Sequence, residues 1–268
     1  HTLIMSATPI PRTLSLILYG DLDVSVLDEL PPGRKPVTTR CVPKAKRKAM
    51  YAFVERQVHA GRQAYVVCPL VEQSESLEGV MSVNELFAEL EKTLHVRVGL
   101  LHGKMAAAKK EETARAFRAG EIDVLVSTTV IEVGVDVKNA TVMVIENADR
   151  FGLAQLHQLR GRVGRGAAES WCFLVSDNAS ESVQKRLKFL CSTSDGFAVA
   201  QYDLETRGPG DFFGSRQHGL PTLQIADLMN DTRTLHAAQS EAAALLAEDP
   251  LLCLLYTSPS PRDMRRSR

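Results

Sequence analysis

Val124-Leu-Val-Ser-Thr-Thr-Val-Ile-Glu-Val-Gly-Val-Asp136 joins a short, continuously apolar run to a segment that carries hydroxyl groups and a glycine. A run of this kind is typical of a strand buried on both faces of a parallel sheet. Similar apolar runs occur at residues 64–68, 96–101, 142–145 and 172–175. The sequence therefore predicts several strands of one buried parallel sheet.

Segments with helical patterns separate these runs. They cover residues 46–60, 83–93, 106–119 and 152–163, and Gly61 and Gly120 are predicted to end the first and third of them. Alternation of strand and helix is typical of an α/β fold with helices on both faces of the sheet. After residue 176 only helices are expected, at 181–190, 198–204 and 237–247, with a glycine-rich segment at 206–217.

Composition limits the classes of function. The 268 residues carry 32 basic and 32 acidic side chains, so any binding of nucleic acid must depend on local charge. The five cysteines lack the spacing of a metal site, and we interpret them as reduced core residues of a cytoplasmic protein. The sequence contains neither an apolar run of membrane-spanning length nor a signal-peptide pattern.

Gln158-Leu-Arg-Gly-Arg-Val-Gly-Arg-Gly166 places arginines among glycines. Arg162 and Arg165 are three positions apart, so they would share a face if the helix continued through them. The planar guanidinium matches phosphate, and glycine lets a ligand approach the backbone. Such arginines can stabilise the charge that develops during phosphoryl transfer. The alternative is a solvated basic turn at the end of a surface helix.

The segment after the run at 124–127 carries a second candidate site. The hydroxyls of Thr128 and Thr129 are suited to a nucleic-acid phosphate, Gly134 to a tight turn, and Asp136 to accepting a hydrogen bond from a ribose hydroxyl. The alternative is a Ser/Thr cap on a following helix. Lys104 follows the run at 96–101 and provides a point charge for backbone phosphate.

Three other features receive a simpler interpretation. His102 is assigned to capping or packing, and the basic run Lys44-Ala-Lys-Arg-Lys48 to a solvated helix face. The pair Asp28-Glu29 does not follow a strand, so it is rejected as a magnesium site. The sequence also lacks the Gly-x-x-x-x-Gly-Lys-Ser/Thr loop that cradles nucleotide phosphates.

Three motifs carry a family resemblance. Ser6-Ala-Thr-Pro-Ile-Pro-Arg-Thr-Leu14, the segment from Thr128 to Asp136, and Phe151-Gly-Leu-Ala-Gln-Leu-His-Gln-Leu-Arg-Gly-Arg-Val-Gly-Arg-Gly166 resemble motifs III, V and VI of superfamily 2 helicases. In order, residues 1–250 resemble the C-terminal part of the RecG family of ATP-dependent DNA helicases. The transcription-repair coupling translocases share the first and last motifs. The segments 21–34 and 208–214 favour RecG over them.

The resemblance implies a RecA-like helicase lobe with a central parallel sheet, followed by a helical hairpin and a translocation loop. It implies roles for several residues: Arg162 and Arg165 as arginine fingers, Gly134 and Asp136 as ATP contacts, Thr128 and Thr129 as DNA-backbone contacts, and Arg186, Arg207 and Gln217 in coupling ATP state to movement on DNA. Lys138 stands where the family usually has proline.

We expect four segments. Residues 1–20 would end a first helicase lobe, 21–177 would form the second lobe, and 178–252 would carry the hairpin, the translocation loop and the C-terminal helices. Residues 253–268 resemble the translation of a sequencing adapter, and the alternative is a genuine Ser/Pro/Arg-rich disordered tail. The start at His1 without methionine suggests a piece of a longer protein.

By resemblance, the function is ATP-dependent remodelling of branched DNA, by fork reversal and branch migration in repair and recombination. ATP with Mg²⁺ is the expected cofactor, with the magnesium ligands in the absent first lobe. Branched DNA is the expected partner, and a monomer the expected state. The alternative is that this chain acts only as a nucleic-acid-binding module without ATP turnover.

Overall fold

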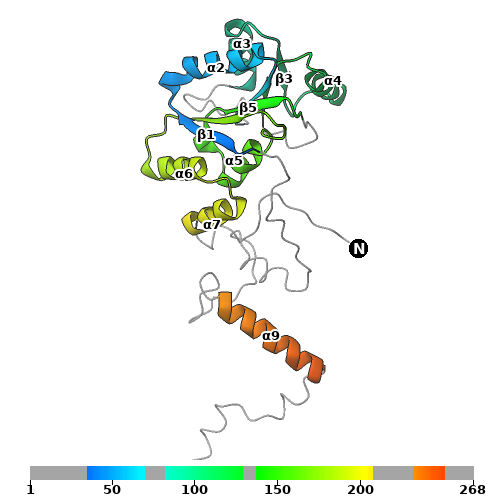
Figure 1. The fold of residues 1–268 in the computed structure, drawn as a ribbon, viewed down its shortest axis with the longest axis vertical. Coiled ribbons are helices and arrows are strands. Elements are labelled where there is room, and N and C mark those ends of the chain that lie inside the picture. The colour runs from blue at the N-terminus through cyan, green and yellow to red at the C-terminus, as the bar shows by residue number, and fades with distance from the viewer. Residues whose placement is uncertain (1–34, 70–81, 129–136, 208–231, 251–268) are drawn as a thin grey trace, which may run out of the picture. The chain divides into compact units, whose positions relative to one another are not determined.

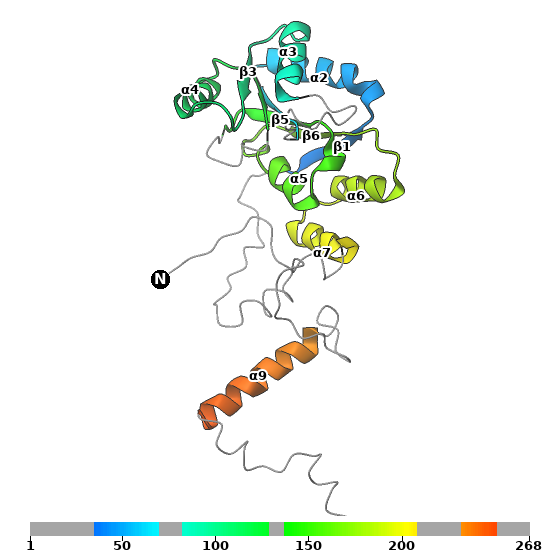
Figure 2. The same ribbon diagram turned by 180° about the vertical axis from the view of Figure 1, so that it is seen from behind.

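The computed structural model describes residues 35–69, 82–128, 137–207 and 232–250. Within these ranges six parallel strands form one sheet in the order β1-β6-β5-β2-β4-β3 (Figure 1 and Figure 2). The strands are β1 (Val37–Val42), β2 (Gln63–Val67), β3 (Val98–Leu101), β4 (Val124–Ser127), β5 (Ala140–Ile145) and β6 (Ser170–Val175). The predicted parallel sheet is therefore confirmed.

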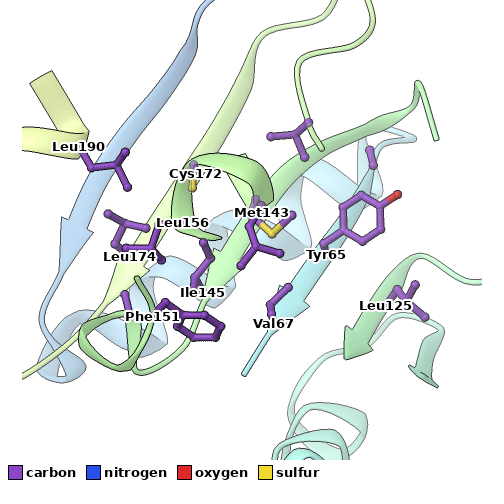
Figure 3. Close-up of a cluster of buried hydrophobic side chains, with 14 of the residues drawn as sticks. Tyr65, Val67, Leu125, Met143, Ile145, Phe151, Leu156, Cys172, Leu174 and Leu190 are labelled. Carbon is purple, nitrogen blue, oxygen red and sulfur yellow. The ribbon is translucent and has the colours of Figure 1, made fainter. Parts of the chain in front are cut away.

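Helices cover both faces of this sheet. On one face, α2 (Arg47–His59) and α3 (Val83–Thr93) pack against Ala64, Val66 and their neighbours. On the other face lie the helices α4 (Ala107–Arg118), α5 (Leu153–Arg160), α6 (Glu181–Ser192) and α7 (Gly196–Arg207). Figure 3 shows the second layer, where Leu156 and Leu190 pack toward Met143, Ile145 and Cys172. Because both faces are covered, the inner strands are apolar at consecutive positions.

The ends of the helices follow local chemistry. Gly61 and Gly120 have φ angles of +79° and +76°, so they end α2 and α4 in the left-handed region, as predicted. The helix α3 begins at Ser82, whose Oγ accepts a hydrogen bond from the Glu85 N–H while the Glu85 carboxylate accepts one from the Ser82 N–H. This capping box fixes the start of α3.

The helices α6 and α7 form a hairpin on the body of the sheet. The rings of Phe189 and Tyr202 stack across it with centroids 4.0 Å apart. Leu187 and Leu190 of α6 and Val199 of α7 belong to the same buried cluster as the strands. The predicted helical hairpin is thus present, and it packs on the lobe. A domain division at residue 177 stays a prediction from the sequence.

The chain packs as two units, of which residues 35–207 belong to the first and residues 232–250 to the second. In the second, α9 (Thr232–Glu248) is the described element, and Leu245 and Leu246 are exposed on it. Among the described residues, no helix combines the length and the apolar character that crossing a membrane requires.

The interpretation of the cysteines as core residues was only partly right. Cys68 and Cys172 are buried, but Cys41 is exposed and Cys191 is half-buried. Cys41 lies on β1, an edge strand that pairs with β6 alone within the described sheet. An edge strand leaves side chains open to solvent that an inner strand would bury.

Candidate functional site

The arginine motif forms a turn after α5 rather than part of a helix. The helix α5 ends at Arg160, Gly161 is its C-cap, and Gly164 has a φ of +75°. The interpretation that Arg162 and Arg165 share a helix face was therefore wrong, because left-handed Gly164 lies between them. The turn instead folds back so that Arg165 Nε donates to the Gly161 carbonyl oxygen at 3.2 Å.

Glycines anchor this turn against the amino ends of the strands. A Cβ atom on Gly164 would lie 2.7 Å from Val37 Cγ2, at the start of β1. A Cβ atom on Gly166 would lie 2.9 Å from the Lys138 carbonyl oxygen, just before β5. Both separations are shorter than a side chain tolerates, so glycine allows the turn to sit directly on the sheet.

Replacing Gly164 with alanine is expected to lower the free energy of unfolding more than replacing Gly120. Both positions lose about 1–2 kcal/mol because they are left-handed. Gly164→Ala adds the contact with Val37, and overpacking of this kind costs about 1–3 kcal/mol. Gly120 is a matched control, because its φ is +76° and a Cβ atom added there would have nothing within 4 Å. Denaturant unfolding measures both, and equal losses would contradict the packing role.

The three arginines of the motif occupy different environments. Arg165 is exposed and Arg162 is half-buried, whereas Arg160 is 5% exposed. Arg160 Nη1 donates to the carbonyl oxygens of Leu190 at 2.7 Å and Thr193 at 2.6 Å. Burial lowers the pKa of the Arg160 guanidinium. Arg160 therefore holds the end of α6 against α5, a role that the sequence did not separate from phosphate binding.

Thr128 and Lys104 lie at the opposite edge of the sheet. Thr128 directly follows β4, and Lys104 lies in the turn after β3, so both are at carboxyl ends of strands. Lys104 is exposed, while Thr128 is 1% exposed and its Oγ1 lacks a hydrogen-bond partner in the described part of the chain. The structure thus separates these two residues from the arginine turn by the length of the strands.

A buried ion pair at the carboxyl edge was not predicted. Arg47 Nε donates to Glu146 Oε1 at 2.6 Å, and the other guanidinium nitrogens donate to both oxygens of Glu89. The Tyr51 hydroxyl also donates to Glu146 Oε1, at 2.7 Å. Assigning the whole run 44–48 to a solvated face was therefore wrong for Arg47, whose side chain is 18% exposed. The sequence feature that could have indicated this ion pair is Glu146, an acidic residue that directly follows the apolar strand β5.

Despite burial, the hydrogen bonds to Glu89 and Glu146 raise the pKa of Arg47 above its usual range. The cluster joins α2, α3 and the end of β5 around one fixed positive charge. Because the one guanidinium bonds two carboxylates, the cluster orders the carboxyl edge and presents no positive charge to a ligand.

Arg186 lies on α6 and reaches the segment before α5. Its Nη2 donates to the Asp149 carbonyl oxygen at 2.7 Å, while its Nε is buried without a hydrogen-bond partner in the described part of the chain. Asp149 Oδ1 also accepts from Ser176 Oγ at 2.7 Å. Asp149 belongs to the short helix η3 (Ala148–Arg150), so Arg186 ties α6 to the approach of α5 and its arginine turn.

The remaining predicted residues stay predictions. Arg207 ends α7, and its side chain is not among those described. Thr129, Gly134, Asp136 and Gln217 lie outside the described residues. Within the described ranges, no three His, Cys, Asp or Glu side chains gather closely enough to hold a metal ion.

Two family models match the chain. Residues 45–167 match the helicase conserved C-terminal domain, and residues 193–255 match the model described as ATP-dependent DNA helicase RecG, domain 3, C-terminal. The first covers the sheet with its arginine turn, and the second begins at the turn between α6 and α7.

Relatives extend the same similarity over most of the chain. The ATP-dependent DNA helicase RecG of Thermotoga maritima is 51% identical over 249 residues, which are 92% of this chain and 32% of that protein. The RecG of Bacillus subtilis is 49% identical, with 92% of this chain and 36% of that protein covered. The chain therefore spans about a third of the length of these curated relatives.

A solved structure shares the fold. It is a RecG bound to a three-way DNA junction, which is 50% identical, with a TM-score of 0.69 over 86% of this chain and 30% of that chain. The RecA-like helicase lobe predicted from the motifs is thereby confirmed.

Proposed function

Because this chain belongs to the RecG family of DNA helicases, we propose that it is the second motor lobe and coupling element of an ATP-dependent helicase that remodels branched DNA in repair and recombination. One observation in the structure supports this proposal above the others. The turn that exposes Arg165 lies at the amino edge of the sheet, and Thr128 and Lys104 lie at its carboxyl edge, while α6 contacts elements that lead to the turn. Two separate ligands can therefore act on one rigid sheet.

In this proposal the nucleotide lies at the amino edge. Arg162 and Arg165 offer guanidinium groups to its phosphates, and the glycines keep the turn close to the sheet. These residues fit a triphosphate, because arginine forks match phosphate oxygens in pairs. Bound Mg²⁺ would neutralise phosphate charge, and its ligands would come from the partner lobe. Gly134 and Asp136 complete the proposed ATP site.

The nucleic acid lies at the carboxyl edge in the same proposal. Lys104 contributes a point charge to the DNA backbone, and Thr128 and Thr129 contribute hydroxyls. Because Thr128 Oγ1 is buried, its contact requires this hydroxyl to become accessible when DNA binds. Contacts of this kind position a duplex without reading its sequence, which suits an enzyme that acts on branched DNA of any sequence. The proposal includes action in the cytoplasm as a monomer, and sedimentation of the protein with and without DNA tests the latter.

The chain alone is expected to show no DNA-stimulated ATP hydrolysis, because the sheet offers arginines but the sequence has no phosphate loop. The matching experiment uses a hybrid in which this chain replaces the corresponding third of the Bacillus subtilis relative. The hybrid should hydrolyse ATP when a three-way junction is added and should unwind that junction. A hybrid that binds the junction without turnover would instead support the alternative of a binding module. Turnover by the purified chain alone would contradict the proposal that this lobe supplies only part of the ATP site.

A further inference from the structure

Two thiols that are distant in the sequence lie next to each other between the edge strand β1 and the helix α6. Cys41 of β1 and Cys191 of α6 have their Sγ atoms 3.4 Å apart, although 150 positions separate them. We propose that these residues form a redox-reactive pair, which a small disulfide such as oxidised glutathione converts into an intramolecular disulfide between β1 and α6. The proposal is independent of the helicase function.

The geometry requires little movement. A disulfide has an S–S length of about 2.05 Å, so the sulfurs must approach by about 1.4 Å from their present contact. Small rotations about the two side-chain torsions are enough for a displacement of this size. The strand alternation places Cys41 on the same face of β1 as Val37, and both Val37 and Cys191 pack against the same buried cluster.

The two thiols differ in a way that assigns their roles. The pKa of the Cys41 thiol lies below its ordinary value, mainly through the hydrogen bond with Cys191 and also through the charge of Lys188, although burial opposes both. The same hydrogen bond raises the pKa of Cys191, with burial adding to it. Cys41 is also exposed. Cys41 is therefore the attacking thiolate, and Cys191 is the thiol that resolves the intermediate.

The other described cysteines are internal controls. Burial raises the pKa of Cys68 to about 12 and that of Cys172 to about 12. Both are enclosed in the two cores, so an oxidant neither reaches them nor finds a thiolate. Selective reaction at Cys41 is the expected consequence.

The chemistry proceeds in two exchanges. The Cys41 thiolate attacks one sulfur of the small disulfide, its S–S bond breaks, and one small thiolate leaves. Cys191 then loses its proton to water and attacks the Cys41 sulfur, which releases the second small thiolate. The protein loses two electrons, and the small disulfide is reduced to two thiols.

The disulfide would restrain the end of α6, which Arg160 also contacts. Cys191 lies between Leu190 and Thr193, whose carbonyl oxygens accept hydrogen bonds from Arg160. The disulfide would therefore fasten to β1 the same turn that Arg160 fastens to α5. Oxidation is expected to make the end of α6 harder to displace from the sheet.

The test treats the full chain with oxidised glutathione and maps its peptides by mass spectrometry. A Cys253→Ser background removes the one cysteine outside the described residues. We expect a Cys41–Cys191 cross-link that forms at least about tenfold faster than any modification of Cys68 or Cys172, because reaction rate follows the exposed thiolate. The melting temperature should rise by about 5 °C on oxidation and return on reduction, because the bond closes a long loop.

Two variants separate the roles. Cys191→Ser should accumulate glutathione on Cys41, since the resolving thiol is gone, and Cys41→Ser should leave Cys191 largely unmodified. The peptide map of the unsubstituted chain keeps the proposal testable if either variant folds poorly. A stable mixed disulfide at Cys41 in the unsubstituted chain, or reaction no faster than at the buried cysteines, would overturn the proposal.

Discussion

Arg165→Ala in the hybrid helicase is expected to lower ATP turnover by about 10³–10⁵-fold, which equals about 4–7 kcal/mol of barrier. Binding of a three-way junction should remain near that of the unsubstituted hybrid. The reason is the position of Arg165, exposed in a turn whose backbone is fixed by Gly164 and Gly166 against the sheet. A fixed backbone with an exposed guanidinium offers a charge in a defined place, as a phosphoryl-transfer site requires.

The chain offers a closely matched control for this variant. Arg118 is also exposed, and its Nε donates to the carbonyl oxygen four residues earlier, Ala114, at 3.3 Å, as Arg165 Nε does to Gly161. Arg118→Ala removes the same kind of local contact on α4 and should leave turnover unchanged. Arg165→Lys should not restore activity, because an ammonium group lacks the planar fork. Near-normal turnover in Arg165→Ala would refute the assignment.

Five strands were predictable from the sequence because they are buried on both faces. Short, continuous apolar runs that alternate with helical segments are typical of such strands, and they matched strands β2 to β6 within a few residues. The strand β1 lacked this signal. Its sequence Val-Thr-Thr-Arg-Cys-Val interrupts the apolar residues with three polar ones, and none of the six is buried, because the strand lies at the edge of the sheet.

The backbone conformation of the arginine motif and the burial of Arg160 could not be predicted from the sequence. Spacing predicted that Arg162 and Arg165 share a helix face, but Gly164 between them has a left-handed φ angle. The turn packs there against Val37, a residue more than 120 positions earlier in the sequence. The burial of Arg160 also depends on a distant element, the end of α6. Residue type and spacing identified the motif, but tertiary contacts give Arg160 a structural role and leave Arg165 exposed, where we propose that it faces a ligand.

Arg186→Ala in the same hybrid is expected to separate ATP hydrolysis from DNA unwinding. Hydrolysis and junction binding should stay within about twofold, while unwinding should fall by about 3- to 30-fold, which corresponds to a coupling of about 0.7–2 kcal/mol. In the described part of the chain, Arg186 forms no hydrogen bond with a residue that we assign to a ligand, although its partner Asp149 lies just past the carboxyl end of β5. It joins α6 to Asp149, and Asp149 precedes the helix that carries the arginine turn.

The incomplete hydrogen bonding of Arg186 supports this choice of residue. A half-buried guanidinium whose buried Nε lacks a partner in the described part of the chain is held less firmly than one whose donors are all satisfied. Such a side chain can exchange partners between two arrangements, as a coupling element must. Arg207 and Gln217, which the family resemblance also assigns to coupling, are proposed to supply the alternative contacts.

The neighbouring residue provides the control for this variant. Lys185 lies on the same helix and pairs with Glu181 at 2.8 Å, but both side chains are largely exposed, so the pair contributes little. Lys185→Ala should leave hydrolysis, binding and unwinding unchanged. If Arg186 served only to pack α6, its alanine variant would lose all three activities together, with a lowered melting temperature. Loss of unwinding at an unchanged melting temperature is the result that only a coupling role explains.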